Sequence, residues 1–204
     1  MLGRRAFLKI TAALGAVQMA RPAQADALPD WASKLVEAAH RQVGVTVSYD
    51  PAYVTLSYPN GDVPRDRGVC TDVVIRAYRD AFGVDLQKLV HEDMRANFAA
   101  YPKNWGLTKP DRNIDHRRVP NLETYFTRRG RALPVSDKAA DWRPGDVFSQ
   151  RLPGGPPHMG VVSDRTNLDG TRPLAIHNIG AGARVEDVVF AFKRVGHFRI
   201  PPSA

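Results

Sequence analysis

The chain has 204 residues, of which 43% are hydrophobic and 25% are charged, with 16 glycines and 16 prolines. This composition is typical of one globular domain and excludes a fibrous or disordered chain. The single cysteine, Cys70, excludes an internal disulfide framework and a cysteine-rich zinc site. The formal net charge is +8, but the first 25 residues contain four basic and no acidic residues, so the remainder carries only +4. This mild charge argues against a nucleic-acid partner.

The first 25 residues have the three parts of an export signal. The pair Arg4-Arg5 lies in a short basic segment, residues 10–20 are apolar, and residues 23–25 provide a small-x-small cleavage site. Paired arginines are typical of the twin-arginine export route. The apolar stretch is about half of the roughly 20 residues that span a bilayer, so we expect removal of the segment rather than a stable membrane anchor. These features predict a periplasmic or secreted protein that begins near Asp26.

The first half of the exported chain combines amphipathic helices with turn-rich segments. Apolar residues at helical spacing, capping residues and breakers locate the elements, and Cys70 lies in the first turn of one helix. In chain order we predict a helix at residues 30–43 capped by Asp30, an extended segment at 45–58, helices at 69–82 and 86–101, a polar and basic loop at 103–120, and a short helix from Asn121 to Gly130.

The last third of the chain changes to short β-prone runs separated by Pro, Gly, Asn and Asp. Such runs predict an antiparallel meander. Helices followed by strands indicate an α+β fold, with N-terminal helices packed on a C-terminal antiparallel sheet, in a single domain over residues 28–204. The predicted strands are residues 146–152, 158–164, 174–179, 185–192 and 194–200.

Three residues together suit nucleophilic catalysis. Cys70 begins a helix, His158 opens one predicted strand, and His177 lies in the next strand. A helix N-terminus and a nearby imidazole both lower the pKa of a thiol, which favours the reactive thiolate. His158 would act as the base, and His177 would fix the tautomer of its ring, with Asn178 or Asp146 as alternatives for that role. The competing interpretation is a packed core cysteine with histidines on half-buried strands.

Four polar residues are candidates for substrate binding. Asp72 lies in the first helical turn, although the helix dipole favours a carboxylate there in any case. Asp115 and His116 lie in the long polar loop, and Asn178 follows His177. Arginines at positions 112, 117 and 118 could bind carboxylates or form a solvated basic face, and tyrosines at 49, 53 and 58 could line a cleft.

Four segments resemble the NlpC-type cysteine peptidases of the papain-like clan, which cleave amide bonds in bacterial cell-wall peptides. They are residues 69–74, 142–148, 158–162 and 176–178, in the family's order. Residues 66–72 and 113–122 are more closely similar to a bacterial exported family of unknown function that is placed near this clan.

The chain departs from the NlpC-type pattern in two ways. Val69 precedes Cys70 where the family usually has an acidic residue. The 88 residues that separate Cys70 from His158 also exceed the usual spacing, because a helical and loop region at about 86–133 is inserted. These departures concern the choice of substrate more than the nucleophile.

The resemblance implies a papain-like, NlpC-like fold and an exported thiol hydrolase. It would cleave amide bonds in peptidoglycan peptides through an acyl-enzyme on Cys70, without a cofactor. Two alternatives stay open: an acyltransferase of the same clan, and a non-catalytic module that binds peptidoglycan. A zinc site of Cys70, His158 and His177 has suitable ligand types but lacks the short ligand spacing typical of such sites, so we expect no metal. No oligomeric state is predicted.

Overall fold

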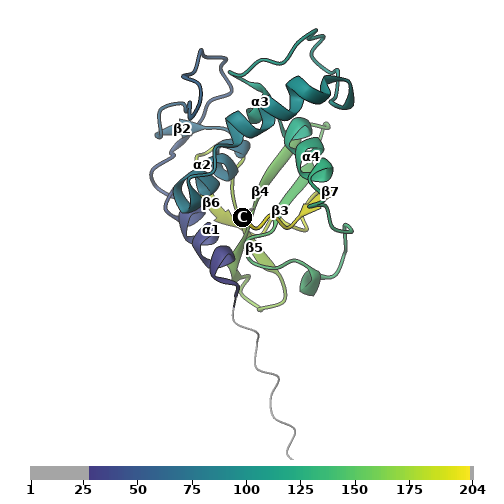
Figure 1. The fold of residues 1–204 in the computed structure, drawn as a ribbon. Coiled ribbons are helices and arrows are strands. Elements are labelled where there is room, and N and C mark those ends of the chain that lie inside the picture. The colour runs from purple at the N-terminus through teal and green to yellow at the C-terminus, as the bar shows by residue number, and fades with distance from the viewer. Residues whose placement is uncertain (1–27, 203–204) are drawn as a thin grey trace, which may run out of the picture.

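The computed structural model describes residues 28–202. The export signal predicted at residues 1–25 lies outside this part of the chain. Within it, the α+β prediction is confirmed: helices come first and are followed by a five-stranded antiparallel sheet (Figure 1). None of the described helices is long and apolar enough to cross a membrane.

The helices lie close to their predicted positions. Two start differently: Pro29 rather than Asp30 is the N-cap of the first, and the last begins at Val119 rather than after Asn121. This early start places Pro120 in the first turn, where no N–H donor is needed. The helices are α1 (Asp30–His40), α2 (Cys70–Phe82), α3 (Leu86–Asn97) and α4 (Val119–Arg128), with short 3₁₀ turns η1 (Phe98–Ala100), η2 (Asp115–Arg117) and η3 (Ala139–Asp141).

The sheet is antiparallel throughout, with the strand order β6-β5-β4-β3-β7. The predicted meander is correct from β3 to β6 and wrong for β7, which pairs with β3 at the opposite edge. The strands are β3 (Val147–Arg151), β4 (Pro157–Thr166), β5 (Pro173–Asn178), β6 (Ala183–Glu186) and β7 (Lys193–Phe198); in addition β1 (Ser48–Tyr49) pairs with β2 (Arg67–Gly68) in parallel.

The segment between β6 and β7 explains this topology. Val189 is buried there with Phe148 and Val162 of the sheet. The side-chain amide of Gln150 donates to the carbonyl oxygens of Val188 and Val189, at 2.7 and 2.8 Å. The second part of the strand predicted at residues 185–192 therefore crosses the sheet and covers its apolar side chains. The chain thus reaches the free edge of β3, where β7 pairs.

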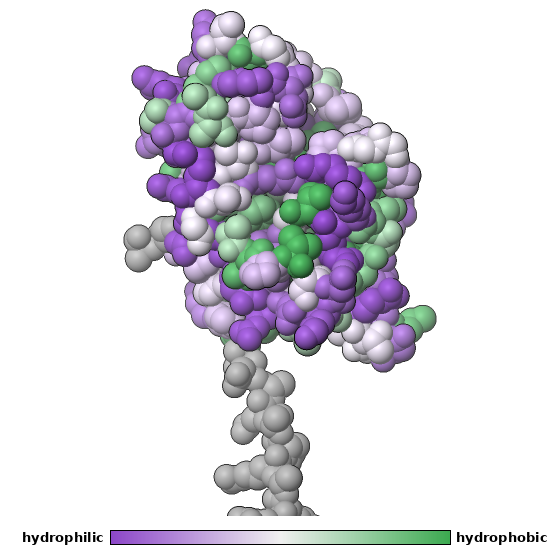
Figure 2. Space-filling model, turned by 90° about the vertical axis from the view of Figure 1, so that its right-hand side faces the viewer, coloured by the Kyte–Doolittle hydropathy of each residue, from purple (hydrophilic) through white to green (hydrophobic). Residues whose placement is uncertain are grey.

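The main core lies between the helices and the other face of the sheet. Alternation along β4 directs Met159 and Val161 into the cluster that contains Cys70 and Val73 of α2. Helices α1, α2 and α4 all contact this face (Figure 1). Figure 2 shows that hydrophilic side chains cover most of one outer face, where hydrophobic side chains gather in a patch near the centre.

Candidate active site

Cys70 is the first residue of α2 and is buried, with 4% of its surface exposed. The helix starts here because Val69 has an extended backbone and the Asp72 carboxylate accepts a hydrogen bond from the Val69 N–H at 2.6 Å. This arrangement is half of a capping box. It fixes the thiol at the helix N-terminus, as the sequence predicted.

Burial controls the acidity of the thiol. It raises the pKa of Cys70 to about 12, and the negative charge of Asp72 acts in the same direction. Backbone N–H groups of Met159, Thr71 and Cys70 itself partly oppose this rise in pKa. The sequence predicted a lowered pKa for this thiol, whereas the structure raises it. The reason is that desolvation penalises the thiolate more than the helix terminus stabilises it.

The two predicted site histidines form a buried pair. Nε2 of His158 on β4 lies 3.0 Å from Nδ1 of His177 on β5, and the rings meet edge to face. Their exposed fractions are 2% and 0%. Burial and the neighbouring His177 lower the pKa of His158 to about 3, so its ring is neutral near pH 7. Neutral imidazole carries no charge that could stabilise a thiolate.

The thiol and the histidine pair meet at the backbone of β4. The Met159 N–H that acts on the Cys70 sulfur belongs to the peptide that directly follows His158. Among the described residues no hydrogen bond joins the thiol to either imidazole, and the hydrogen bond of the His158 ring runs through its Nε2 to His177. Nδ1 is thus the His158 ring nitrogen that does not face His177, on the residue directly before the Met159 N–H at the thiol.

Gly160 makes room for the Phe148 ring, which meets His158 edge to face, and was not recognised from the sequence. It is the cross-strand partner of His177 and lies two residues after His158 on the same face of β4. A Cβ atom at this position would lie 2.8 Å from the Phe148 ring and from the carbonyl oxygen of Ile176. A lone glycine inside a predicted strand was the signal for such a close approach.

A pocket of about 260 Å³ opens beside Cys70. Tyr49 lies in its wall, and its hydroxyl interacts with the thiol. Burial, together with Cys70 and Asp72, raises the pKa of Tyr49 to about 12, so the hydroxyl keeps its proton and can donate it in a hydrogen bond. Of the three tyrosines proposed to line a cleft, only Tyr49 lines this pocket.

The long loop contributes Trp105 and Arg118 to the lining of this pocket. The Arg118 guanidinium carbon lies 4.0 Å from the centre of the Trp105 ring. One of its nitrogens, Nη1, contacts Asp115 at 3.0 Å. A stacked guanidinium at the rim of a pocket is suited to bind an anionic group of a ligand.

Asp72 is held in a buried ion pair and does not line the pocket. Nε of Arg117 lies 3.0 Å from its Oδ1 and Nη2 lies 2.9 Å from its Oδ2. The Thr71 hydroxyl donates to the carbonyl oxygen of Arg117 at 2.9 Å. Asp72 therefore ties the long loop to the start of α2, which is a structural role.

The other residues predicted to bind substrate are also buried away from the pocket. Asp115 and His116 are 1% and 2% exposed, in η2. The side chain of Asn178 donates to backbone carbonyls of β1 and β2, at 3.2 and 3.0 Å, so His177 and not Asn178 contacts His158. Asp146, the other alternative partner, is bonded to His197 and Arg199 instead.

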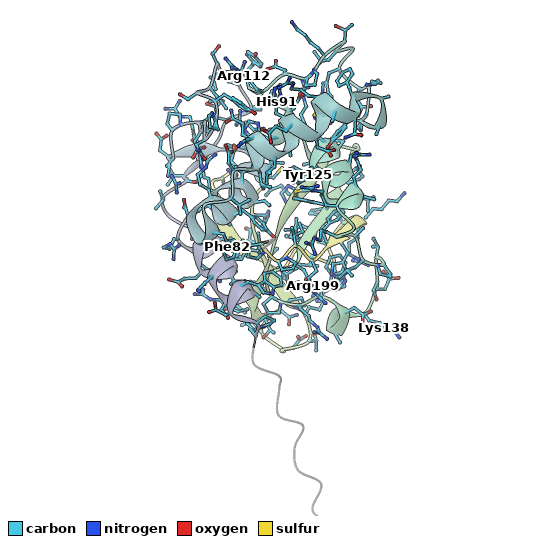
Figure 3. All side chains as sticks on the ribbon, in the orientation of Figure 1. Phe82, His91, Arg112, Tyr125, Lys138 and Arg199 are labelled. Carbon is cyan, nitrogen blue, oxygen red and sulfur yellow. The ribbon has the colours of Figure 1, made fainter. Side chains whose placement is uncertain are left out.

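A second pocket, of about 200 Å³, lies away from these residues. It is mostly apolar and is bounded by Tyr125 of α4, Tyr78 of α2 and the segment from Ile200 to Pro202 (Figure 3 labels Tyr125). It contains no thiol or imidazole. Within residues 28–202 no three His, Cys, Asp or Glu side chains are grouped to hold a metal ion.

Known proteins share this architecture. The fold, with helices on one face of a five-stranded antiparallel sheet, resembles the crystal structure of an N-acetylmuramoyl-L-alanine amidase from Bacteroides uniformis, with a TM-score of 0.51. The likeness covers 83% of this chain and 98% of the amidase, at 12% sequence identity, and so concerns the fold alone.

The sequence assigns the family. The chain belongs to the family described as domain of unknown function DUF1287, which matches residues 36–200. It is 59% identical over 165 residues to the uncharacterized protein YijF of Escherichia coli K12, a match that covers 81% of this chain and 80% of that protein.

Proposed function

We propose that the protein is an exported thiol hydrolase that cleaves amide bonds in peptidoglycan peptides. One observation carries the proposal: a thiol at a helix N-terminus lies against the backbone N–H of Met159 on β4, and the preceding residue, His158, is hydrogen-bonded through its ring to a second histidine. The fold shared with an N-acetylmuramoyl-L-alanine amidase supports a cell-wall substrate. The export signal predicted in the first 25 residues agrees with a reaction outside the cytoplasm.

In the proposed reaction, Sγ of Cys70 attacks the carbonyl carbon of an amide while Nδ1 of His158 accepts the thiol proton. Because burial keeps the thiol and the imidazole neutral at rest, the proton moves during the attack rather than before it. The C–N bond then breaks, and His158 returns the proton to the departing amine. Water, deprotonated by the same imidazole, hydrolyses the thioester and restores the thiol.

The carbonyl oxygen gains negative charge during the attack. The backbone N–H groups of Cys70 and Thr71 face the sulfur and are positioned to donate to this oxygen. The protonated hydroxyl of Tyr49 is a further donor on the pocket wall. Removing one such donor from a comparable site costs roughly 10²–10³ in kcat.

The pocket supports recognition of a carboxylate on the substrate. Arg118 lines it beside Cys70, and stacking on Trp105 holds the guanidinium plane in place. Peptide stems of peptidoglycan carry free carboxylates, which bind bidentately to arginine. Arg118 thus takes over the substrate-binding role predicted for Asp115 and His116, which are buried.

The burial of the thiol favours a second candidate, a non-catalytic module that binds peptidoglycan. Both candidates are tested by incubating the protein from residue 26 onward with purified peptidoglycan and analysing released fragments by mass spectrometry. Fragments with new amino termini, absent with Cys70→Ala, support the hydrolase. Added amine acceptors that appear in the products indicate an acyltransferase. Sedimentation with peptidoglycan without fragment release supports the binding module.

A further inference from the structure

Glu186, the last residue of β6, lies beside the histidine pair. Its Oε2 is 3.0 Å from Nε2 of His177, the nitrogen that does not face His158. That nitrogen is buried and has no aligned hydrogen bond among the described residues, so the carboxylate approaches it obliquely. The Glu186 side chain is 38% exposed.

Three neighbouring strands place these side chains in a row. His158 is on β4, His177 on β5 and Glu186 on β6, and the strands are adjacent in the sheet. Ala175 pairs with Glu186, and Ala175 and His177 share a face because side chains alternate along a strand. Arg184 is the cross-strand partner of His177, but its Nε donates to the Ala181 carbonyl at 3.3 Å. Glu186 and His158 are thus the titratable groups that contact the His177 ring.

We propose that Glu186 is a positioning residue that sets the tautomers of both histidines and so leaves Nδ1 of His158 free to accept the thiol proton. The inference rests on the proposed function. A carboxylate only accepts hydrogen bonds, so His177 must carry its proton on Nε2. Its Nδ1 is then an acceptor, and the 3.0 Å contact requires a proton on Nε2 of His158. Nδ1 of His158 is therefore the unprotonated nitrogen.

The loss of this carboxylate would remove the constraint. Without it His177 can place its proton on Nδ1 and donate to Nε2 of His158. His158 would then carry its own proton on Nδ1, where it cannot accept one from Cys70. An amide at position 186 can either donate or accept, so it does not select one tautomer.

The first test measures the tautomers directly. The ¹⁵N shifts of the ring nitrogens distinguish protonated from unprotonated sites, and spectra of His158→Asn and His177→Asn assign the two rings among the six histidines. In the wild type we expect the proton on Nε2 of both rings. We expect a mixture of tautomers in Glu186→Gln, and the wild-type pattern in Glu186→Asp and in Asp187→Asn.

Asp187→Asn is the matched control. It removes the same charge one residue away, where the carboxylate pairs with Arg172 at 2.8 Å and does not contact His177. A proton on Nδ1 of His177 in the wild type overturns the proposal even if no variant folds. So does a Glu186→Gln spectrum identical to that of the wild type.

The second test measures alkylation of Cys70 by iodoacetamide between pH 6 and 9. Glu186→Gln should react about tenfold more slowly than the wild type, the lower end of the loss seen when the hydrogen-bond partner of a metal-ligating histidine is removed. Asp187→Asn should match the wild type. Equal rates and pH profiles in Glu186→Gln and the wild type contradict the proposal.

Failure of the proposed hydrolase function and failure of the positioning role of Glu186 give different results. If Cys70 is not the nucleophile, peptidoglycan is not cleaved, but the ring ¹⁵N shifts still report whether Glu186 selects the tautomers. If Glu186 has no such role, the shifts are insensitive to Glu186→Gln while cleavage still depends on Cys70 and His158.

Discussion

Nη2 of Arg117 lies 2.9 Å from Oδ2 of Asp72, in an ion pair whose side chains are 2% and 4% exposed. The pair joins the η2 turn to the helix start that carries Cys70. Removal of one partner leaves a buried charge without compensation. The N-terminal end of α2, which carries Cys70, is therefore anchored by a residue of η2.

The first prediction follows from this ion pair. Arg117→Met should lower the free energy of unfolding by about 3 kcal/mol, the usual cost of breaking a buried pair. Lys34→Met removes one partner of an exposed pair, 57% and 80% exposed, and should change stability by less than about 0.5 kcal/mol. Urea unfolding followed by circular dichroism provides both values. Equal, small changes in the free energy of unfolding for the two substitutions would show that the loop does not stabilise the start of α2.

The second prediction concerns catalysis. Cys70→Ala should fold but release no peptidoglycan fragments, and His158→Ala should be almost as inactive, because thiol and imidazole act as one unit. His177→Asn should keep a measurable fraction of the activity, since His177 only orients the base. Fragment release is quantified by mass spectrometry, alongside thermal unfolding of each variant. Full activity of Cys70→Ala would exclude an acyl-enzyme on this residue.

The third prediction concerns acid stability. Burial lowers the pKa of His116 to about 3 from an ordinary 6.5, so the unfolded chain binds an extra proton between these values. The free energy of unfolding should therefore fall as the pH decreases from 6.5 toward 3. His158, with its pKa also lowered to about 3, adds to the same trend.

Urea unfolding of the wild type and of His116→Gln at pH 4 to 7 measures this effect. Each histidine contributes a slope of up to about 1.4 kcal/mol per pH unit in this window. His116→Gln should flatten the dependence of the unfolding free energy on pH. An unchanged slope would mean that the His116 ring is protonated in the folded protein.

The fourth prediction concerns the substrate. Arg118→Met should raise KM for a peptide that carries a free carboxylate, by about tenfold, with a smaller effect on the same peptide as its amide. Arg129→Met is a matched control, because Arg129 also stacks on an aromatic ring, Tyr125, but lines the distant apolar pocket. Equal KM values for the acid and the amide in the wild type would remove Arg118 from carboxylate recognition.

Several features depend only on residues that are neighbours in sequence, and these could be predicted. Apolar spacing located α2 and with it Cys70 at a helix start. Alternating runs located the strands that carry His158 and His177. Because hydrophobic periodicity and turn residues act within one element, a short window of sequence contains the information that sets them.

Other features were decided by tertiary contacts. Arg117 meets Asp72 across 45 residues of sequence, and the pairing of β7 with β3 required the preceding segment to cover the sheet. The pKa of Cys70 is raised because packing removes water from the thiol, which its place at a helix start does not reveal. Glu186 contacts His177 only because β6 pairs with β5 in one register. Sequence alone thus located Cys70, His158 and His177 on their helix and strands, whereas burial and strand register, which arise only on folding, decided their protonation and their partners.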